Sequence, residues 1–152
     1  MRSIIVGLYV SALVATVLSN SGCSSSTSPA GDSMSAIVGA ENWTAAVVEA
    51  TNSNNVIAIG GLNANGTVQI RLLTYGITQA GTVQIARGQP HSAILYEDGT
   101  IYSANTMVGS GTITFSTLTS QEAEGTFSFT AVNPDKQQSR VVTNGKFRVR
   151  FK

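Results

Sequence analysis

The sequence predicts an all-β domain at residues 34–152: an antiparallel meander of about ten strands that closes as a β-sandwich or a flattened calycin-like barrel. Apolar and polar residues alternate with a period of two, most clearly at residues 68–72, 112–116 and 126–130. Such alternation puts one set of side chains on each face of a sheet. Asn-Gly and Asp-Gly pairs separate these runs, as hairpin turns do. Hydrophobic residues make up 42% of the chain and charged residues 11%, which favours a packed core over disorder.

The expected strands follow one another with short connections, so that sequence neighbours pair antiparallel. They lie at residues 34–38, 43–50, 56–62, 67–74, 82–86, 92–97, 100–104, 111–118, 126–132 and 140–151. Residues 44–49 have some helical propensity, but Trp43, two valines and the turn-forming residues 51–55 favour a strand followed by a loop. No helix is expected in the domain.

Turn chemistry defines the connections. Asp98-Gly99 predicts a two-residue hairpin, because a type I′ turn needs positive φ at both central positions. Asn65-Gly66 predicts another turn before residue 67. Asn144-Gly145 either turns the chain or forms a glycine bulge in a long last strand, and the bulge is favoured because the chain ends soon afterwards.

The N-terminal residues resemble an export signal. Arg2 supplies a positive start, and residues 4–18 form a mostly apolar run without a charge. This run is shorter than the roughly 20 residues that span a bilayer, so a signal peptide at residues 1–22 is expected rather than a membrane helix. A Ser/Thr/Pro/Gly-rich stretch follows, and residues 23–33 are expected to form a flexible tether.

Cys23 is the single cysteine of the chain, and it follows the small residues Ser21 and Gly22. Here the chain resembles bacterial lipoproteins, in which such a cysteine is acylated and becomes the new N-terminus. The resemblance implies lipidation of Cys23, although Asn20 occupies a position where the usual motif has leucine. A plain secretory signal, an intermolecular disulfide and a catalytic thiol are the alternatives, and the last lacks a base or an electropositive pocket.

The anchor would attach the domain to a membrane as an extracytoplasmic lipoprotein. Ser24 and Ser25 after the cysteine lack the aspartate that suggests inner-membrane retention, so the periplasmic side of the outer membrane is favoured. Without residues 1–22, eight basic side chains balance eight acidic ones. This balance gives no indication of a nucleic-acid partner.

Three stretches, residues 34–45, 125–131 and 142–147, carry a second resemblance. They are similar to a family of uncharacterised lipoproteins common in Bacteroidetes-type bacteria, with Gly-Thr-Phe-Ser-Phe and Thr-Asn-Gly-Lys-Phe as the most specific motifs. The resemblance implies a small all-β domain on a lipid anchor, with no catalytic residue assigned. Such bacteria also O-glycosylate Asp-Ser/Thr-apolar sites, so it implies a possible glycan on Ser33 within Asp32-Ser33-Met34.

Side chains for catalysis are scarce. His91 is the single histidine and is expected at a loop end on the surface, so neither a hydrolytic triad nor a zinc site is expected. The acid pairs Glu97/Asp98 and Glu122/Glu124 lie in predicted turns, where carboxylates are ordinarily solvated. No cofactor and no metal are expected.

Two groups of residues are candidate ligand contacts. Lys146, Arg148 and Arg150 alternate with apolar residues and would line one face of the last strand, where they would meet anionic headgroups or acidic glycans or simply remain solvated. Tyr96 and Tyr102 flank the Asp98-Gly99 turn and would stack on a sugar or pack against each other, if they share a face.

The expected function is a non-catalytic, lipid-anchored binding or accessory module of the cell envelope that contacts a glycan or an envelope protein. Two alternatives remain: a calycin-like carrier of a small hydrophobic ligand, and a structural partner of an envelope complex. An interior lined by small residues would favour the carrier, whereas a filled core with an exposed aromatic patch would favour surface contacts.

Overall fold

The computed structural model describes residues 31–152, which form eleven strands. The expected signal peptide, Cys23 and most of the expected tether lie outside the described residues. The strands are β1 (Ser33–Val38), β2 (Glu41–Thr44), β3 (Val47–Ser53), β4 (Val56–Leu62), β5 (Val68–Tyr75), β6 (Gly81–Ile85), β7 (Ser92–Glu97), β8 (Thr100–Ala104), β9 (Ser110–Leu118), β10 (Glu122–Asn133) and β11 (Gln138–Arg150). Residues 31–152 contain no helix of the length and hydrophobicity that a membrane crossing requires.

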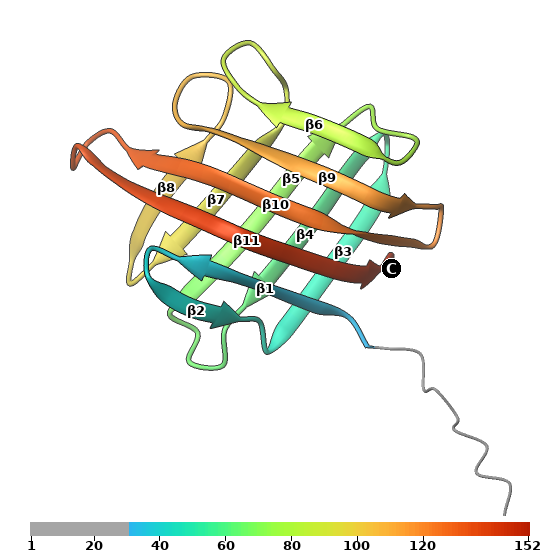
Figure 1. Ribbon diagram of the computed structural model, residues 1–152, viewed down its shortest axis with the longest axis horizontal. Helices are drawn as coiled ribbons and strands as arrows, with labels where there is room; N and C mark the ends of the chain where they lie inside the picture. The colour runs from blue at the N-terminus through green and yellow to red at the C-terminus, as the bar shows by residue number, and fades with distance from the viewer. Residues whose placement is uncertain (1–30) are drawn as a thin grey trace, which may run out of the picture.

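The strands lie in two layers that cross at an angle (Figure 1). The front layer has the order β2-β1-β11-β10-β9-β6 and the back layer the order β3-β4-β5-β7-β8, with antiparallel pairs throughout. Val132 of β10 pairs with Ser103 of β8 and joins the layers. Lys152 N donates a 3.2 Å hydrogen bond to Ala50 O of β3. The sheet therefore curls into a half-barrel, which confirms the predicted all-β sandwich or flattened barrel.

The connectivity departs from the predicted meander in two places. β6 leaves the back layer and pairs with β9, so β5 pairs with β7. The strand predicted at residues 43–50 is two strands, because the chain passes from one layer to the other at Ala45 and Ala46. Ala45 N donates to Met34 O of β1, and Ala46 N donates to Leu62 O of β4. This change of hydrogen-bond partner explains why there are eleven strands rather than about ten.

The hairpin between β7 and β8 has the predicted turn. Asp98 and Gly99 have φ values of 46° and 79°, as a type I′ turn requires. Asn54 and Asn55, with φ values of 52° and 61°, form a second turn of this kind between β3 and β4. Both turns set the registers of their hairpins.

The other two predicted Asn-Gly sites differ from each other. Gly66, with φ of 72°, lies in the β4–β5 connection, where its N–H donates to Asn63 O at 3.1 Å. Asn144 and Gly145 lie inside β11, where Asn144 has φ of 51° and the register shifts against the neighbouring strands β1 and β10. The favoured prediction of a bulge rather than a turn is therefore confirmed.

Aromatic rings fill the space between the layers. The rings of Phe115 and Phe147 meet edge to face with centroids 5.6 Å apart, and Phe127 stacks on Phe147 at 6.5 Å. Trp43 is buried, and its Nε1 donates to Val68 O at 3.2 Å. Large side chains thus occupy the interior, so the outer faces of the layers remain as places for binding.

Candidate functional site

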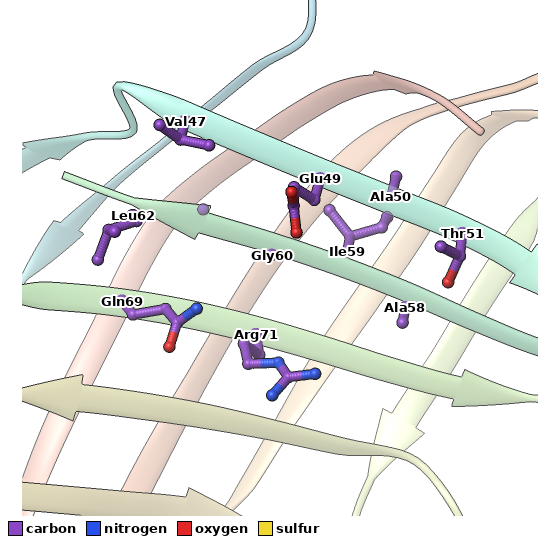
Figure 2. A pocket seen from close by; sticks show the side chains of 11 residues that line it. Val47, Glu49, Ala50, Thr51, Ala58, Ile59, Gly60, Leu62, Gln69 and Arg71 are labelled. Carbon is purple, nitrogen blue, oxygen red and sulfur yellow. The ribbon is translucent and has the colours of Figure 1, made fainter. Parts of the chain in front are cut away.

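A groove of about 460 Å³ runs over the outer face of β4, between side chains of β3 and β5 (Figure 2). The outward positions of β4 include Ala58 and Gly60, which are small, whereas the neighbouring strands carry longer side chains. The floor is therefore lower than the two sides. We call this site the β4 groove; the lining residues used below are Val47, Glu49, Thr51, Gly60, Leu62, Gln69 and Arg71.

Two adjacent glycines of β4 serve opposite faces of the sheet. A Cβ atom on Gly60 would lie 3.7 Å from Arg71 Cγ, an ordinary contact, so the outer side has room to spare. A Cβ atom on Gly61 would lie 2.8 Å from Trp43 Cη2 and 2.9 Å from Ala45 Cβ, so the inner side has none. Gly60 therefore opens the groove, and Gly61 makes space for the buried tryptophan.

An acidic and a basic residue lie on the two strands that flank the groove floor. Gly60 pairs with Glu49 on β3 and with Arg71 on β5, so the three residues form one row across the strands. Among residues 31–152, neither Glu49 nor Arg71 takes part in an ion pair. Gln69 lies two residues before Arg71 on the same face of β5 and adds an amide. The groove thus offers opposite charges on opposite sides.

A second row crosses the same face beside the charged one; we call it the apolar row because four of its five residues are Val, Leu, Tyr and Ile, with Gln69 in the middle. Strand pairing aligns Val47, Leu62, Gln69, Tyr96 and Ile101 across β3, β4, β5, β7 and β8. Val47 and Ile101, at the two ends, expose 54% and 57% of their surface. Apolar area of this kind on an outer face favours contact with another molecule.

The outer face of the front layer carries a second hollow, of about 700 Å³, beside the bulge of β11. Its lining is mainly polar and includes Thr44, Thr126, Ser128, Asn144 and Lys146. Hydroxyl and amide groups of this kind form hydrogen bonds with water and with sugars alike. This hollow is therefore a weaker candidate than the β4 groove, where charge and apolar surface are combined.

The predicted basic residues do line one face of β11, and all three are exposed. Acidic neighbours partly balance them: Arg148 Nε lies 3.9 Å from Glu124 Oε2, and Arg150 Nε lies 3.3 Å from Asp32 Oδ1. Within residues 31–152, Lys146 has no such partner and lines the second hollow. A basic surface therefore survives mainly at Lys146.

Tyr96 and Tyr102 do not share a face, so both expectations, a two-tyrosine platform and packing of the two rings against each other, are wrong. The two-residue turn pairs Tyr96 with Ile101 and Leu95 with Tyr102. Tyr102 is 2% exposed and points into the core, where its hydroxyl donates to Gln138 Oε1 at 3.2 Å. Only Tyr96 lies on the outer face, in the apolar row.

His91 is buried at 7% exposure, which corrects the expectation of a surface position. The N–H of Tyr75 on β5 donates to His91 Nδ1 at 3.3 Å, because the ring turns back onto the neighbouring strand. Burial lowers the pKa of His91 below its ordinary value of 6.5. The neutral imidazole therefore serves as a structural acceptor in the folded protein.

Glu97 of the β7–β8 hairpin is engaged structurally. Glu97 Oε2 accepts a 2.6 Å hydrogen bond from Arg140 Nε, and this bond raises the pKa of Arg140. The guanidinium also lies over the ring of Tyr102, 5.0 Å from its centroid. The described part of the chain has no group of three or more His, Cys, Asp or Glu side chains that would hold a metal ion.

Ser33, the residue with a possible O-linked glycan, begins β1 and is exposed. The preceding Asp32 accepts hydrogen bonds from both the backbone N–H and Nε of Arg150, at 3.0 and 3.3 Å. The following Met34 is buried. The hydroxyl of Ser33 is therefore accessible, while glycosylation itself stays a prediction.

Comparison with known proteins places the chain. A family model described as a domain of unknown function (DUF6252) matches residues 31–149. The chain belongs to this family. The match spans the described strands almost completely and confirms the predicted resemblance to an uncharacterised domain. Neither a curated protein nor a solved structure matches the chain.

In this DUF6252 chain the two motifs meet in space. The first motif supplies Gly125 and Phe127 on β10, and the second supplies Gly145 and Phe147 on β11. Gly125 pairs with Phe147, and Phe127 pairs with Gly145. Each glycine thus lies beside a ring, so the motifs describe packing between two strands rather than a site.

The sequence alone did not point to the β4 groove of this family member. The β3–β4 turn at Asn54-Asn55 would have indicated that Glu49 lies beside Gly60, because a two-residue turn fixes the register. Arg71 reaches the same row through the longer β4–β5 connection, whose register the sequence leaves open. The pairing of Glu49 with Gly60 could therefore have been inferred from the sequence, whereas the pairing of Gly60 with Arg71 could not.

Proposed function

We propose that the protein is a non-catalytic binding module, held at the cell envelope by a lipid on Cys23, with the β4 groove as its ligand site. The apolar leader and the small residues before Cys23 support export and lipidation. The absence of an aspartate after the cysteine supports the outer membrane as its location. Glycans, peptides and envelope proteins are the candidate ligands.

The observation that carries this proposal is the position of the groove on the outside of a filled sandwich. Met34, Trp43, Phe115 and Phe147 lie between the layers and occupy the space that a carrier would keep for its ligand. The calycin-like alternative is disfavoured for this reason. A ligand is instead accommodated where Gly60 leaves an opening.

A structural partnership within an envelope complex is the second candidate. The apolar row supports it through Val47, Leu62, Tyr96 and Ile101, because covering exposed apolar surface with another protein lowers the free energy of the complex. This row and the β4 groove share Val47, Leu62 and Gln69. A bound partner would therefore compete with a small ligand.

The structural engagement of His91 and Glu97 within residues 31–152 supports a binding role. His91 is buried against β5, and Glu97 is held by Arg140. Glu49 and Arg71 stand apart across the groove, an arrangement suited to recognition of charge rather than to proton transfer between them.

A ligand screen of the full-length chain in detergent tests the binding role. The screen presents glycans, peptides and lipid vesicles to the wild type and to Gly60→Val, which fills the groove floor with a side chain that β-strands favour. Binding by the wild type that Gly60→Val abolishes is expected. A ligand that both proteins bind equally would refute the groove as the site.

The anchor is tested separately in the cell. The mass of the membrane-extracted protein is expected to show acyl groups on an N-terminal Cys23, and Cys23→Ser is expected to release the domain from the membrane fraction. An exported protein with an unmodified Cys23 would refute the anchor and leave the binding role in place.

A further inference from the structure

The row of Glu49, Gly60 and Arg71 indicates a class of ligand for the β4 groove. We propose that the groove binds a small zwitterion, whose ammonium faces Glu49 and whose carboxylate faces Arg71. This inference rests on the proposed function, since it names the ligand of the same site. Figure 2 shows Glu49 extending from β3 over Gly60, whereas Arg71 starts on β5, on the other side of β4, and extends along its own strand.

The separation of the two strands that carry the charges leaves room for a ligand between them. Neighbouring strands lie about 4.8 Å apart, so the backbones of Glu49 and Arg71 are separated by about 10 Å across Gly60. Neither side chain has an ion-pair partner within the described residues. A zwitterion would satisfy both charges at once, with charge-assisted hydrogen bonds that are stronger than neutral ones.

Arg71 and its neighbour Gln69 offer a carboxylate several hydrogen-bond donors in addition to a positive charge. The guanidinium presents donors in a planar fork that matches a carboxylate. Gln69, on the same face of β5, contributes amide donors next to it. The opposite side has Glu49 and Thr51, whose oxygens accept hydrogen bonds from an ammonium.

The rest of the groove selects an apolar side chain on the ligand. Val47 and Leu62 pair directly at one end of the groove, next to the charged row. The volume of about 460 Å³ suits a small molecule rather than a polymer. An α-amino acid with an apolar side chain and an apolar dipeptide both have this chemistry.

Calorimetric titration of the full-length chain at low salt tests the charges. Leucine and leucyl-leucine are the probes, and N-acetyl-leucine and leucinamide each lack one of the two ligand charges. We expect the wild type to lose at least about tenfold in affinity for either neutralised probe. Tighter binding of leucine or of the dipeptide identifies the source of the zwitterion.

Charge-neutral variants assign each ligand charge to its partner. Glu49→Gln is expected to bind leucine and N-acetyl-leucine equally, and Arg71→Gln is expected to bind leucine and leucinamide equally. Glu41→Gln and Arg87→Gln remove exposed charges outside the groove and are expected to behave as the wild type. Affinities that do not depend on either ligand charge would overturn the proposal.

The Gly60→Val variant separates this proposal from the general binding role. Loss of leucine binding with an unchanged melting temperature supports both. If the wild type binds no zwitterion but another ligand that Gly60→Val abolishes, the zwitterion is refuted and the binding role stands. If Gly60→Val changes no binding of any ligand, both are refuted.

Discussion

Phe147 of β11 stands opposite Gly125 of β10, and its Cζ would lie 2.8 Å from a Cβ atom on that glycine. The carbonyl oxygen of Thr114 on β9 would lie closer still. Phe115 pairs with the same glycine from β9 and meets Phe147 edge to face. A hydrogen atom at position 125 therefore allows two rings from two strands to fill the core together.

Gly125→Ala is expected to lower the free energy of unfolding by about 1–3 kcal/mol, because backbone or rings must shift to admit a methyl group. Urea denaturation measures the effect. Gly60→Ala is the matched control, since a Cβ atom there makes ordinary contacts, and it is expected to be neutral or to stabilise by about 0.5 kcal/mol. Equal stabilities of the two variants would contradict the assigned packing.

The two tyrosines of the β7–β8 hairpin are expected to respond differently to truncation. Tyr102→Ala removes a buried ring, a hydroxyl contact with Gln138 and the surface under Arg140, and should destabilise by about 3–5 kcal/mol. Tyr96→Ala, on the outer face, should cost about 1 kcal/mol or less. Thermal unfolding of both variants checks the hairpin register, and a reversed order would exclude it.

Stability should depend on the protonation of His91. Because the pKa of His91 is lowered in the folded protein, the unfolded chain binds the proton more readily. His91 therefore leaves the free energy of unfolding unchanged well above pH 6.5 and lowers it as the pH falls below 6.5. Protonation also removes the acceptor for the Tyr75 N–H.

Urea denaturation between about pH 5 and pH 7.5 measures this dependence, and His91→Gln serves as the comparison because its amide does not titrate. The wild type should lose more stability than His91→Gln as the pH falls. Parallel curves for the two proteins would contradict the prediction, because they would show that His91 has the same pKa in the folded and unfolded states.

Lys146 should dominate any binding of anionic glycans to the front layer. It lines the hollow there, whereas Arg148 and Arg150 lie near Glu124 and Asp32. Lys146→Ala is expected to weaken such binding by about tenfold, and Arg148→Ala by less than threefold. Glycan-array titrations with both variants measure the difference, and equal losses would favour the whole basic strand as the contact.

Sequence reasoning succeeded where local chemistry determines structure. The alternation of residues 126–130 and the turn at Asp98-Gly99 predicted strands and a hairpin that the structure confirms. It failed where the strand bounds or the burial of a residue depend on contacts with strands far away in the sequence. The break at Ala45 and Ala46 follows from partners on β1 and β4, and the burial of His91 follows from β5.

The candidate site shows the same limit. The opposite faces of Tyr96 and Tyr102 could have been worked out from the sequence. A two-residue turn at residues 98 and 99 pairs each even-numbered residue with an odd-numbered one, so two even-numbered residues on the two strands lie on opposite faces. The pairing of Gly60 with Arg71 required the three-dimensional register. The sequence therefore indicated the charged strand β11 and the two tyrosines as candidate contacts, although an inconspicuous glycine on β4 shapes the β4 groove.

The first and last strands, β1 and β11, are neighbours: Ser33 pairs with Arg148. A polypeptide emerging from the ribosome cannot complete such a sheet until nearly its final residues are available. The entropy of closing so long a loop must be overcome before the contacts reward it, which slows folding. The nascent chain should consequently form the local hairpins of the back layer first and seal the front layer only when synthesis is nearly finished.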